Sequence, residues 1–472
     1  MKLPFSELRR FVPAWTKTPE DLAELLTFSG TEVEGIEDRA GDRVLECAVT
    51  SNRVDCLGWL GLARDVAAVG GLELAPSFAP PRLSGGATSE VVKIEVEDSA
   101  FCPRYVGVVV EGLKVGPSSE ALRARVERAG LRPINNVVDV SNVVMFELNQ
   151  PLHAFDLDRL RGGRVVVRRG RKGESLRALN GKDYALDSDM GLICDAEGPI
   201  AIAGVMGGAD SETTEKTTRL LIESAAFDPA SVRRTSRRLQ LRSDASYRFE
   251  RGVDRNGALA AGLAAAALIV ENCGGTIRSA PLDVGSAGEI PASIRFRVAR
   301  VEKVAGVAVP KDEIVRIFGG LGCGAVPAAE PETFDVRPPT WRRDLSREID
   351  LVEEVVRCAG LHRIPIGAGL RVATVRPHPE RSLADVVRDR CVQFGLLECV
   401  TPTFVAEEIE GAITFASDAP GFRARNPIRA GEGAVRRSLL PSLLRVRTHN
   451  QDQGVDRLRL FEVANAAFDA PT

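Results

Sequence analysis

Three segments rich in proline and glycine constrain what this chain can fold into. They cover residues 75–91, 279–291 and 365–379. Turn-forming residues at this density interrupt helices and strands, so the first two segments are predicted to be linkers and the third a further break. The chain has 472 residues, enough for about three domains. We therefore expect several domains rather than a single small module.

The composition is that of an ordinary globular protein, with 44% hydrophobic residues, 27% charged residues and a formal charge of -3. The global charge predicts no nucleic-acid binding. The longest apolar stretch, Ala258 to Val270, is too short to span a bilayer and indicates a buried helix. Charges alternate through the first ten residues, so we expect no signal peptide, no membrane contact and a cytoplasmic location. The nine cysteines form no C-x-x-C pair, so neither a zinc site nor a disulfide framework is expected.

Local patterns predict both helices and short strands. Thr18 and Pro19 form the start of a helix that ends at Gly30, and a second helix is predicted from Trp59 to Val69. Short alternating segments between the two linkers indicate a strand-rich α+β domain. Other predicted elements are strands at 44–50, 92–96, 105–110, 165–167, 191–194, 200–202, 294–298 and 458–468, and helices at 258–272, 311–318 and 383–394.

A polar segment at residues 132–142 is followed eleven residues later by His153. An imidazole changes protonation near neutral pH, so His153 could act as a general base or position water, or it could be a structural histidine. Ser141 and Asn142 lie among valines and must find hydrogen-bond partners if they are buried. A pocket lining and a satisfied turn explain these two residues equally well.

Glycines at positions 204, 207 and 208 do not match a nucleotide-binding loop, and they favour either a tight turn or the close approach of a ligand. Glu223 lies inside the apolar run 220–227, where a charged carboxylate is costly to bury without a partner. It could accept a hydrogen bond from a substrate hydroxyl or pair with a nearby arginine.

Two segments are basic although the whole chain is nearly neutral. Residues 159–177 hold eight Lys or Arg, and residues 233–251 hold seven Arg. Phosphates are plausible partners, but a solvated face is the common explanation. Only 5% of residues are aromatic, which does not support a platform for base stacking.

An acidic helix is predicted near the end of the third domain, with Ser346 as its N-cap. Its carboxylates recur on one face, and Asp344 precedes it. These oxygens could bind Mg²⁺ or form a solvated acidic face. The four candidate ligands are Asp344, Asp350, Glu353 and Glu354.

Taken in order along the chain, these motifs resemble the beta subunits of bacterial phenylalanine-tRNA ligases. The similarity includes residues 49–65 and is most specific at residues 132–156, 203–208, 243–254 and 341–357. The resemblance implies an α+β multidomain protein. Its expected parts are an N-terminal helical and α+β domain (1–88), a strand-rich B3/B4 editing domain (89–285), a B5 domain with a DNA-binding-like fold (286–368) and part of a B6/B7 class II synthetase-like domain with an antiparallel sheet (369–472).

The resemblance also implies the site residues and their roles. Glu223 would accept a hydrogen bond from the hydroxyl of a mistakenly attached tyrosine. The carboxylates of the acidic helix would bind a Mg²⁺ ion shared with an alpha subunit. His153, Asn142 and Ser141 would position water and the terminal ribose. The remaining pocket residues would be Gly204, Gly207, Ser243 and Ala245, and the family often has threonine where Ser141 and Ser243 stand.

The implied assembly is an (alpha-beta)₂ heterotetramer that binds tRNA(Phe). ATP is a substrate of its alpha subunit. Two departures from the family pattern are expected: the chain has no room for an OB-fold insert between residues 36 and 45, and it ends within the catalytic-like domain, which suggests a fragment. Three functions remain open, namely an editing beta subunit, a scaffold without editing activity and a free-standing deacylase.

Overall fold

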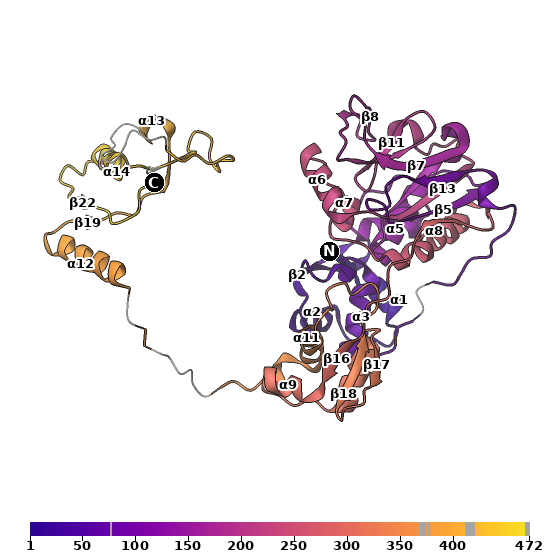
Figure 1. Ribbon diagram of the computed structural model, residues 1–472, viewed down its shortest axis with the longest axis horizontal. Coiled ribbons are helices and arrows are strands. Elements are labelled where there is room, and N and C mark those ends of the chain that lie inside the picture. Colours follow the sequence, from indigo (N-terminus) through magenta and orange to yellow (C-terminus); the bar gives the residue numbers. More distant parts are fainter. Residues whose placement is uncertain (76–77, 368–373, 376–377, 411–420, 468–472) are drawn as a thin grey trace. The chain divides into compact units, whose positions relative to one another are not determined.

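The computed structural model describes residues 1–75, 78–367, 374–375, 378–410 and 421–467. These residues belong to two compact units, Met1–Ile366 and Gly367–Thr472. Figure 1 shows the helices and strands of both units. The architecture mixes helices and sheets, as the sequence predicted.

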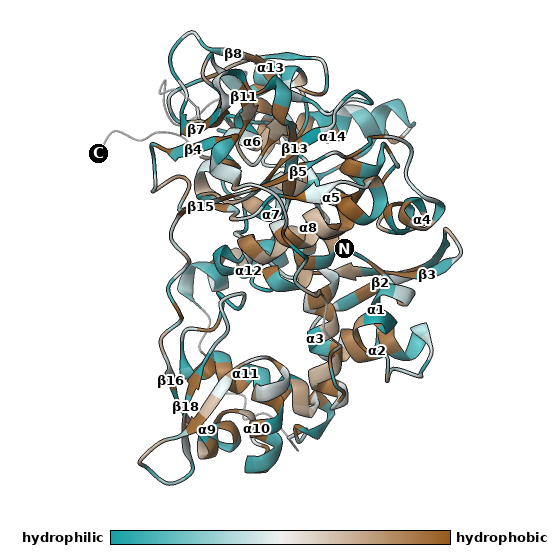
Figure 2. Ribbon diagram, turned by 90° about the vertical axis from the view of Figure 1, so that its right-hand side faces the viewer, coloured by the Kyte–Doolittle hydropathy of each residue, from teal (hydrophilic) through white to brown (hydrophobic). Residues whose placement is uncertain are grey.

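The N-terminal region combines a small antiparallel sheet with three helices. The helix α2 begins where predicted, because the Thr18 hydroxyl accepts a hydrogen bond from the backbone N–H of Asp21 and the Asp21 side chain caps Thr18 in return. The α3 helix contributes a mostly apolar face, which Figure 2 colours as hydrophobic. The elements are β1 (Lys2–Pro4), α1 (Phe5–Phe11), α2 (Pro19–Phe28), β2 (Glu32–Arg39), β3 (Asp42–Ala48) and α3 (Trp59–Gly70), with sheet order β1-β3-β2.

The central part contains two larger sheets. The first has the order β12-β11-β10-β7-β4, formed by β4 (Lys93–Val96), β7 (Arg164–Arg169), β10 (Gly191–Cys194), β11 (Pro199–Ile202) and β12 (Met206–Gly207). The second has the order β14-β5-β13-β6, with β15 also paired to β5. Its strands are β5 (Arg104–Glu111), β6 (Leu152–Asp156), β13 (Arg219–Ala226), β14 (Thr276–Ile277) and β15 (Leu282–Gly285).

Five helices and a small hairpin accompany these sheets. They are α4 (Glu120–Arg128), α5 (Asn136–Leu148), α6 (Pro229–Leu239), α7 (Asp244–Phe249), α8 (Ala258–Cys273) and the hairpin β8 (Ser175–Arg177) with β9 (Asp183–Ala185). One segment of the described chain, Arg255–Cys273, is long and apolar enough to cross a membrane by composition alone. It contains α8, whose buried alanines pack against α5, β5 and β13, so α8 is a core helix here as predicted.

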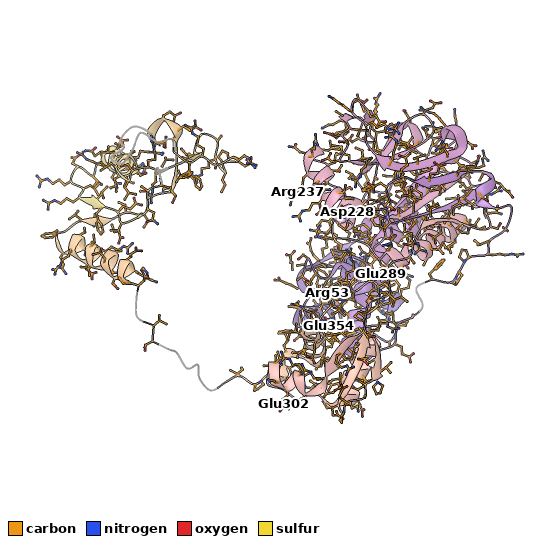
Figure 3. All side chains as sticks on the ribbon, in the orientation of Figure 1. Arg53, Asp228, Arg237, Glu289, Glu302 and Glu354 are labelled. Carbon is orange, nitrogen blue, oxygen red and sulfur yellow. The ribbon has the colours of Figure 1, made fainter. Side chains whose placement is uncertain are left out.

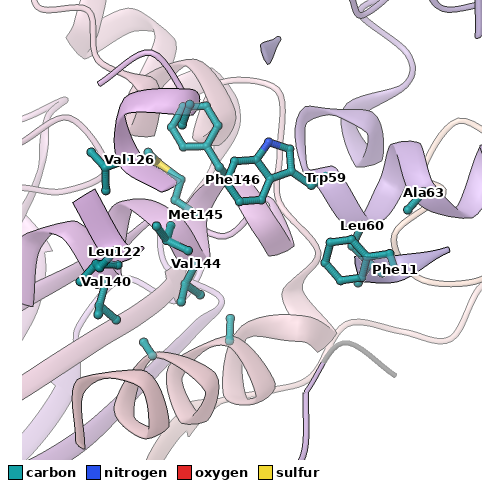
Figure 4. Close-up of a cluster of buried hydrophobic side chains, with 14 of the residues drawn as sticks. Phe11, Trp59, Leu60, Ala63, Leu122, Val126, Val140, Val144, Met145 and Phe146 are labelled. Carbon is teal, nitrogen blue, oxygen red and sulfur yellow. The ribbon is translucent and has the colours of Figure 1, made fainter. Parts of the chain in front are cut away.

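One hydrophobic core joins the N-terminal region to the central part. Trp59 on α3 lies beside Phe146 on α5, with ring centroids 6.0 Å apart, and Figure 4 shows the surrounding valines. The same core includes Leu3, Phe11 and Ile269. A second core fills the space between the two larger sheets. The predicted linker at residues 75–91 therefore connects segments that share a core.

The third part of the first unit is a three-stranded antiparallel sheet with three helices. The predicted helix start at Ser346 is wrong: Arg347 is the N-cap, and Asp350 accepts hydrogen bonds from the backbone N–H groups of Ser346 and Arg347. The elements are β16 (Ile294–Arg297), α9 (Val298–Ala305), α10 (Lys311–Gly320), β17 (Gly324–Pro327), β18 (Thr333–Arg337) and α11 (Glu348–Ala359), with sheet order β16-β18-β17.

The second unit holds short strands. Among its described residues β20 and β21 pair antiparallel, whereas β19 and β22 pair parallel, so no single antiparallel sheet of the expected kind is formed there. The strand predicted at 458–468 is limited to β22, and residue 468 lies outside the described residues. The elements are α12 (Pro379–Gln393), β19 (Leu397–Glu398), β20 (Phe404–Val405), α13 (Glu407–Glu410), β21 (Ala434–Val435), α14 (Leu440–Asp452) and β22 (Leu460–Phe461).

Candidate functional site

Two polar side chains predicted to act together lie opposite each other in the second large sheet. Glu223 on β13 pairs in register with His153 on β6 and with Gly107 on β5. Directly opposed residues of an antiparallel pair project to the same face, with Cβ atoms about 5 Å apart. Strand register therefore brings together two residues that are 70 positions apart.

Glu223 is buried and makes one side-chain hydrogen bond among the described residues. The Tyr105 hydroxyl donates to Oε2 of Glu223 over 2.8 Å. Burial raises the pKa of the Glu223 carboxyl to about 7, against the smaller opposing effect of the Tyr105 hydrogen bond. The second oxygen, Oε1, remains available for a ligand.

His153 is half-buried and lies beside Phe155, with ring centroids 4.6 Å apart in an edge-to-face arrangement. Burial lowers the pKa of the imidazole to about 4. The ring is therefore neutral at pH 7. Its Nε2 atom is buried and has no hydrogen-bond partner in the described part of the chain. Buried polar atoms are nearly always satisfied, so a water molecule or a ligand is expected at this nitrogen.

The glycines of the segment 203–207, which follows β11 and ends in β12, are explained by close packing. A Cβ atom on Gly207 would lie 2.7 Å from Cε1 and 2.9 Å from Nε2 of His153. Gly204 has φ of +70°, which side chains other than glycine rarely adopt, and a Cβ there would press on Phe227 and Phe249. The backbone of this segment thus forms one wall against the histidine ring.

Glu223, His153 and the two glycines line one small cavity of about 80 Å³. A single water molecule needs only about 10–15 Å³ of such volume, so the cavity has room for several. Most of the lining residues have apolar side chains, and Glu223 and His153 supply the charged or titratable groups. Five predicted pocket residues form part of the lining: His153, Gly204, Gly207, Glu223 and Ala245.

The other three predicted pocket residues are absent from the lining of this cavity. The Ser141 hydroxyl donates to the backbone oxygen of Val137 within α5. Ser243 is the N-cap of α7, and its hydroxyl donates to the Val205 backbone oxygen. Asn142 is half-buried on α5. The roles predicted for these three residues therefore stay predictions.

The four predicted magnesium ligands do not form a cluster. No group of three or more His, Cys, Asp or Glu side chains suited to a metal occurs among the described residues. Arg342 pairs with both Asp344 and Glu354, and Asp350 caps α11. Glu353 is exposed on α11. With Arg342 paired to two of these carboxylates, the role of the four residues as magnesium ligands stays a prediction.

Tyr105 does not line the cavity, but it is the partner of Glu223 that the sequence analysis missed. It is fully buried, and its hydroxyl finds its partner in Glu223. A signal existed, because Tyr105 and Glu223 are polar groups inside two apolar segments and a buried tyrosine hydroxyl needs a partner. Only the pairing of β5 with β13 reveals that each satisfies the other.

Three family models match the chain. The B3/4 domain matches residues 101–274, the tRNA synthetase B5 domain matches residues 294–361, and the phenylalanyl tRNA synthetase beta chain CLM domain matches residues 369–472. The cavity residues His153 and Glu223, together with Tyr105, the hydrogen-bond partner of Glu223, all lie within the first match.

Curated relatives are similar along most or all of the chain. A phenylalanine-tRNA ligase beta subunit of Rhodopirellula baltica is 38% identical over 100% of this chain and 69% of the relative. Those of Anaeromyxobacter dehalogenans and Salinibacter ruber are 43% and 41% identical, but the chain spans only 53% and 51% of their lengths. The crystal structure of an N-terminal fragment of the phenylalanyl-tRNA synthetase beta subunit from Pyrococcus horikoshii is 15% identical in sequence. Its TM-score is 0.45, with 76% of this chain and 99% of that chain covered, and this similarity is too distant to support any inference.

Proposed function

The chain belongs to the family of phenylalanine-tRNA ligase beta subunits. We propose that its B3/4 domain hydrolyses the ester bond of tyrosine that has been attached in error to tRNA(Phe). In the complete enzyme an alpha subunit would join phenylalanine to this tRNA with the use of ATP. A synthetic site that binds phenylalanine can exclude tyrosine only through the one additional hydroxyl that tyrosine carries. A second site that hydrogen-bonds this hydroxyl can select tyrosine directly.

The observation that carries the proposal is the arrangement of the Glu223 carboxyl. Tyr105 holds Oε2, which fixes the carboxyl plane and leaves Oε1 able to accept a hydrogen bond from the substrate hydroxyl. A phenylalanyl ester offers no donor, so the buried acceptor would stay unsatisfied at a penalty of about 1–3 kcal/mol. The site would therefore prefer the tyrosyl ester and spare the correct product.

His153 is suited to orienting water rather than removing its proton. A general base works best when its pKa is near the working pH, and burial holds the pKa of His153 at about 4. Its unpartnered Nε2 atom can form a hydrogen bond with a water molecule or a ribose hydroxyl next to the ester. Orientation alone contributes large rate factors when the bond to be broken is already reactive.

The partners and cofactors follow from the family. We propose an alpha subunit, in an (alpha-beta)₂ heterotetramer, and tRNA(Phe) as partners, in the cytoplasm. The residues on and before α11 do not fit a magnesium site built from this chain alone, because Arg342 already neutralises Asp344 and Glu354. A Mg²⁺ ion shared with an alpha subunit would need most of its oxygen ligands from that subunit, and no catalytic step proposed here depends on it.

The test compares hydrolysis of Tyr-tRNA(Phe) and Phe-tRNA(Phe) by this chain together with its alpha partner. We expect selective tyrosyl hydrolysis that falls steeply in Glu223→Ala. Glu197→Gln, which changes an exposed glutamate of the same domain, serves as the control and should behave like the wild type. Complex formation without hydrolysis of either ester would instead establish a scaffold, and hydrolysis without the alpha subunit would favour a free-standing deacylase.

A further inference from the structure

A large hollow, lined mainly by residues of the B3/4 domain, lies on the other side of α7 from the cavity just described. Its volume is about 770 Å³, within the range of ligand sites. Ala245 and Phe249, one helical turn apart on α7, line the small cavity. Asp244 and Tyr247 of the same helix line the hollow. A single short helix thus separates the two spaces.

The hollow is strongly basic. Four arginines line it against two carboxylates. Both carboxylates are already paired, Asp244 with Arg248 and Glu250 with Arg251. Within the described residues the side chains of three arginines have neither a hydrogen-bond nor an ion-pair partner, so their positive charge is not compensated. These three are Arg233, Arg237 and Arg242, and Figure 3 labels Arg237 on α6.

One aromatic side chain completes the hollow. Tyr247 has 42% of its surface exposed, and the Arg251 guanidinium lies 3.5 Å from the centre of its ring. Arginine matches the geometry of phosphate oxygens, and an exposed aromatic ring can stack on a nucleobase. This combination is typical of sites for single-stranded nucleic acid.

We propose that this hollow binds the phosphates of the single-stranded 3′ end of aminoacyl-tRNA, so that the ester passes α7 and enters the small cavity. The inference rests on the proposed function and adds where the polynucleotide is held. Ser243, at the start of α7, lines the hollow and donates a hydrogen bond to the Val205 backbone oxygen, and Val205 lines the cavity. A single-stranded RNA segment bound in the hollow is therefore close to the backbone that forms the wall of the small cavity.

The experiment uses the full chain and two tyrosyl esters, one of tRNA(Phe) and one of adenosine, which has no phosphate. We expect the double variant Arg237→Ala and Arg242→Ala to lower kcat/KM for the tRNA ester on the order of tenfold, with a far smaller loss for the adenosine ester. Arg234→Ala is the matched control, because Arg234 is an exposed arginine of the same helix that does not line the hollow. Equal losses for both esters, or equal behaviour of the double variant and the control, would overturn the proposal.

A binding measurement keeps the inference testable if neither ester is hydrolysed. Anisotropy of a labelled short single-stranded RNA should show a salt dependence whose slope falls by about 0.7 for each arginine removed from the hollow. Inorganic phosphate and ATP are the competitors. Weak competition supports a polynucleotide site, whereas competition by ATP as strong as that by RNA would make the hollow a mononucleotide site and overturn the proposal.

Discussion

Arg357 and Asp65, which lie 292 residues apart, are joined by two buried hydrogen bonds of 3.1 Å each. Arg53 donates two more to the same carboxylate, and Arg357 also pairs with Glu354. Burial opposes ionisation, but Arg357 and Arg53 hold the pKa of Asp65 well below its usual range. The network fastens α11 to the N-terminal region, and Figure 3 labels Arg53 and Glu354 within it. The network thereby holds α11, which lies within the residues matched by the B5 domain, against α3.

Removing Arg357 should destabilise the first unit. The variant Arg357→Ala leaves two buried carboxylates with fewer cationic partners, and breaking such a network costs roughly 3 kcal/mol. Urea unfolding followed by tryptophan fluorescence would measure the loss. Arg347→Ala removes an exposed arginine that pairs with Asp350, and this control should change the free energy of unfolding by less than about 1 kcal/mol. Equal effects of the two variants would contradict this account.

The two titratable pocket residues should give stability opposite dependences on pH. Burial raises the pKa of Glu223 from 4.5 to about 7, so its contribution is present below pH 4.5 and lost as the pH rises through 7. Burial lowers the pKa of His153 from 6.5 to about 4, so its contribution is present above pH 6.5 and lost as the pH falls through 4. Each contribution to the free energy of unfolding amounts to roughly 3 kcal/mol. Because one is lost as the pH rises and the other as the pH falls, their pH dependences largely cancel in the wild type.

Single variants should separate these contributions. Relative to the wild type, Glu223→Gln should lose stability as the pH falls from 6.5 to 4, because only the histidine effect remains. His153→Asn should lose stability as the pH rises from 4.5 to 7. Unfolding midpoints recorded across this range test both, and curves parallel to the wild type would show that neither group is perturbed by burial.

The preference for tyrosyl over phenylalanyl ester should increase with pH. The substrate hydroxyl donates best to the ionised carboxylate, which becomes dominant above the pKa of about 7 of Glu223. The ratio of the two hydrolysis rates, measured from pH 6 to pH 8, cancels the intrinsic lability that the esters share. In Glu223→Gln the ratio should stay flat, and a rising ratio in that variant would place the discrimination elsewhere.

Gly207→Ala should impair hydrolysis more than it impairs folding. Its new Cβ atom would press on the His153 ring at 2.7 Å, and a displacement of about 1 Å at a positioning group can lower the rate about 100-fold. Gly198→Ala is the matched control, because its Cβ atom would meet nothing within 4 Å. Rates and thermal midpoints should be compared for both variants. An unchanged rate in Gly207→Ala would remove His153 from the reaction.

Magnesium should have little effect on this chain by itself. Arg342 occupies the carboxylates of Asp344 and Glu354, so a cation would have to displace a guanidinium. Thermal midpoints in Mg²⁺ and in EDTA should therefore agree. A rise in Mg²⁺ that disappears in Asp344→Asn would instead establish a metal site within this chain.

Local sequence signals were sufficient for most elements of the first unit. The cap at Thr18, the apolar composition of α8 and the continuous apolar run of β5 each act over a few residues, so the chain itself specifies them. The motifs also identified the family and five residues of the cavity lining. The predicted antiparallel sheet at the C-terminal end was not formed by the described residues, because strand pairing depends on distant partners.

The sequence by itself determined the presence of most helices and strands of the first unit and which side chains are chemically suited to a site. Tertiary structure alone decided which polar groups satisfy one another. It paired Tyr105 with Glu223 across two strands, and it used Ser243 as a helix cap. It also surrounded Glu354 with arginines. The physical reason is that a buried polar group must find a partner, and strand register and helix packing determine which partner is within reach.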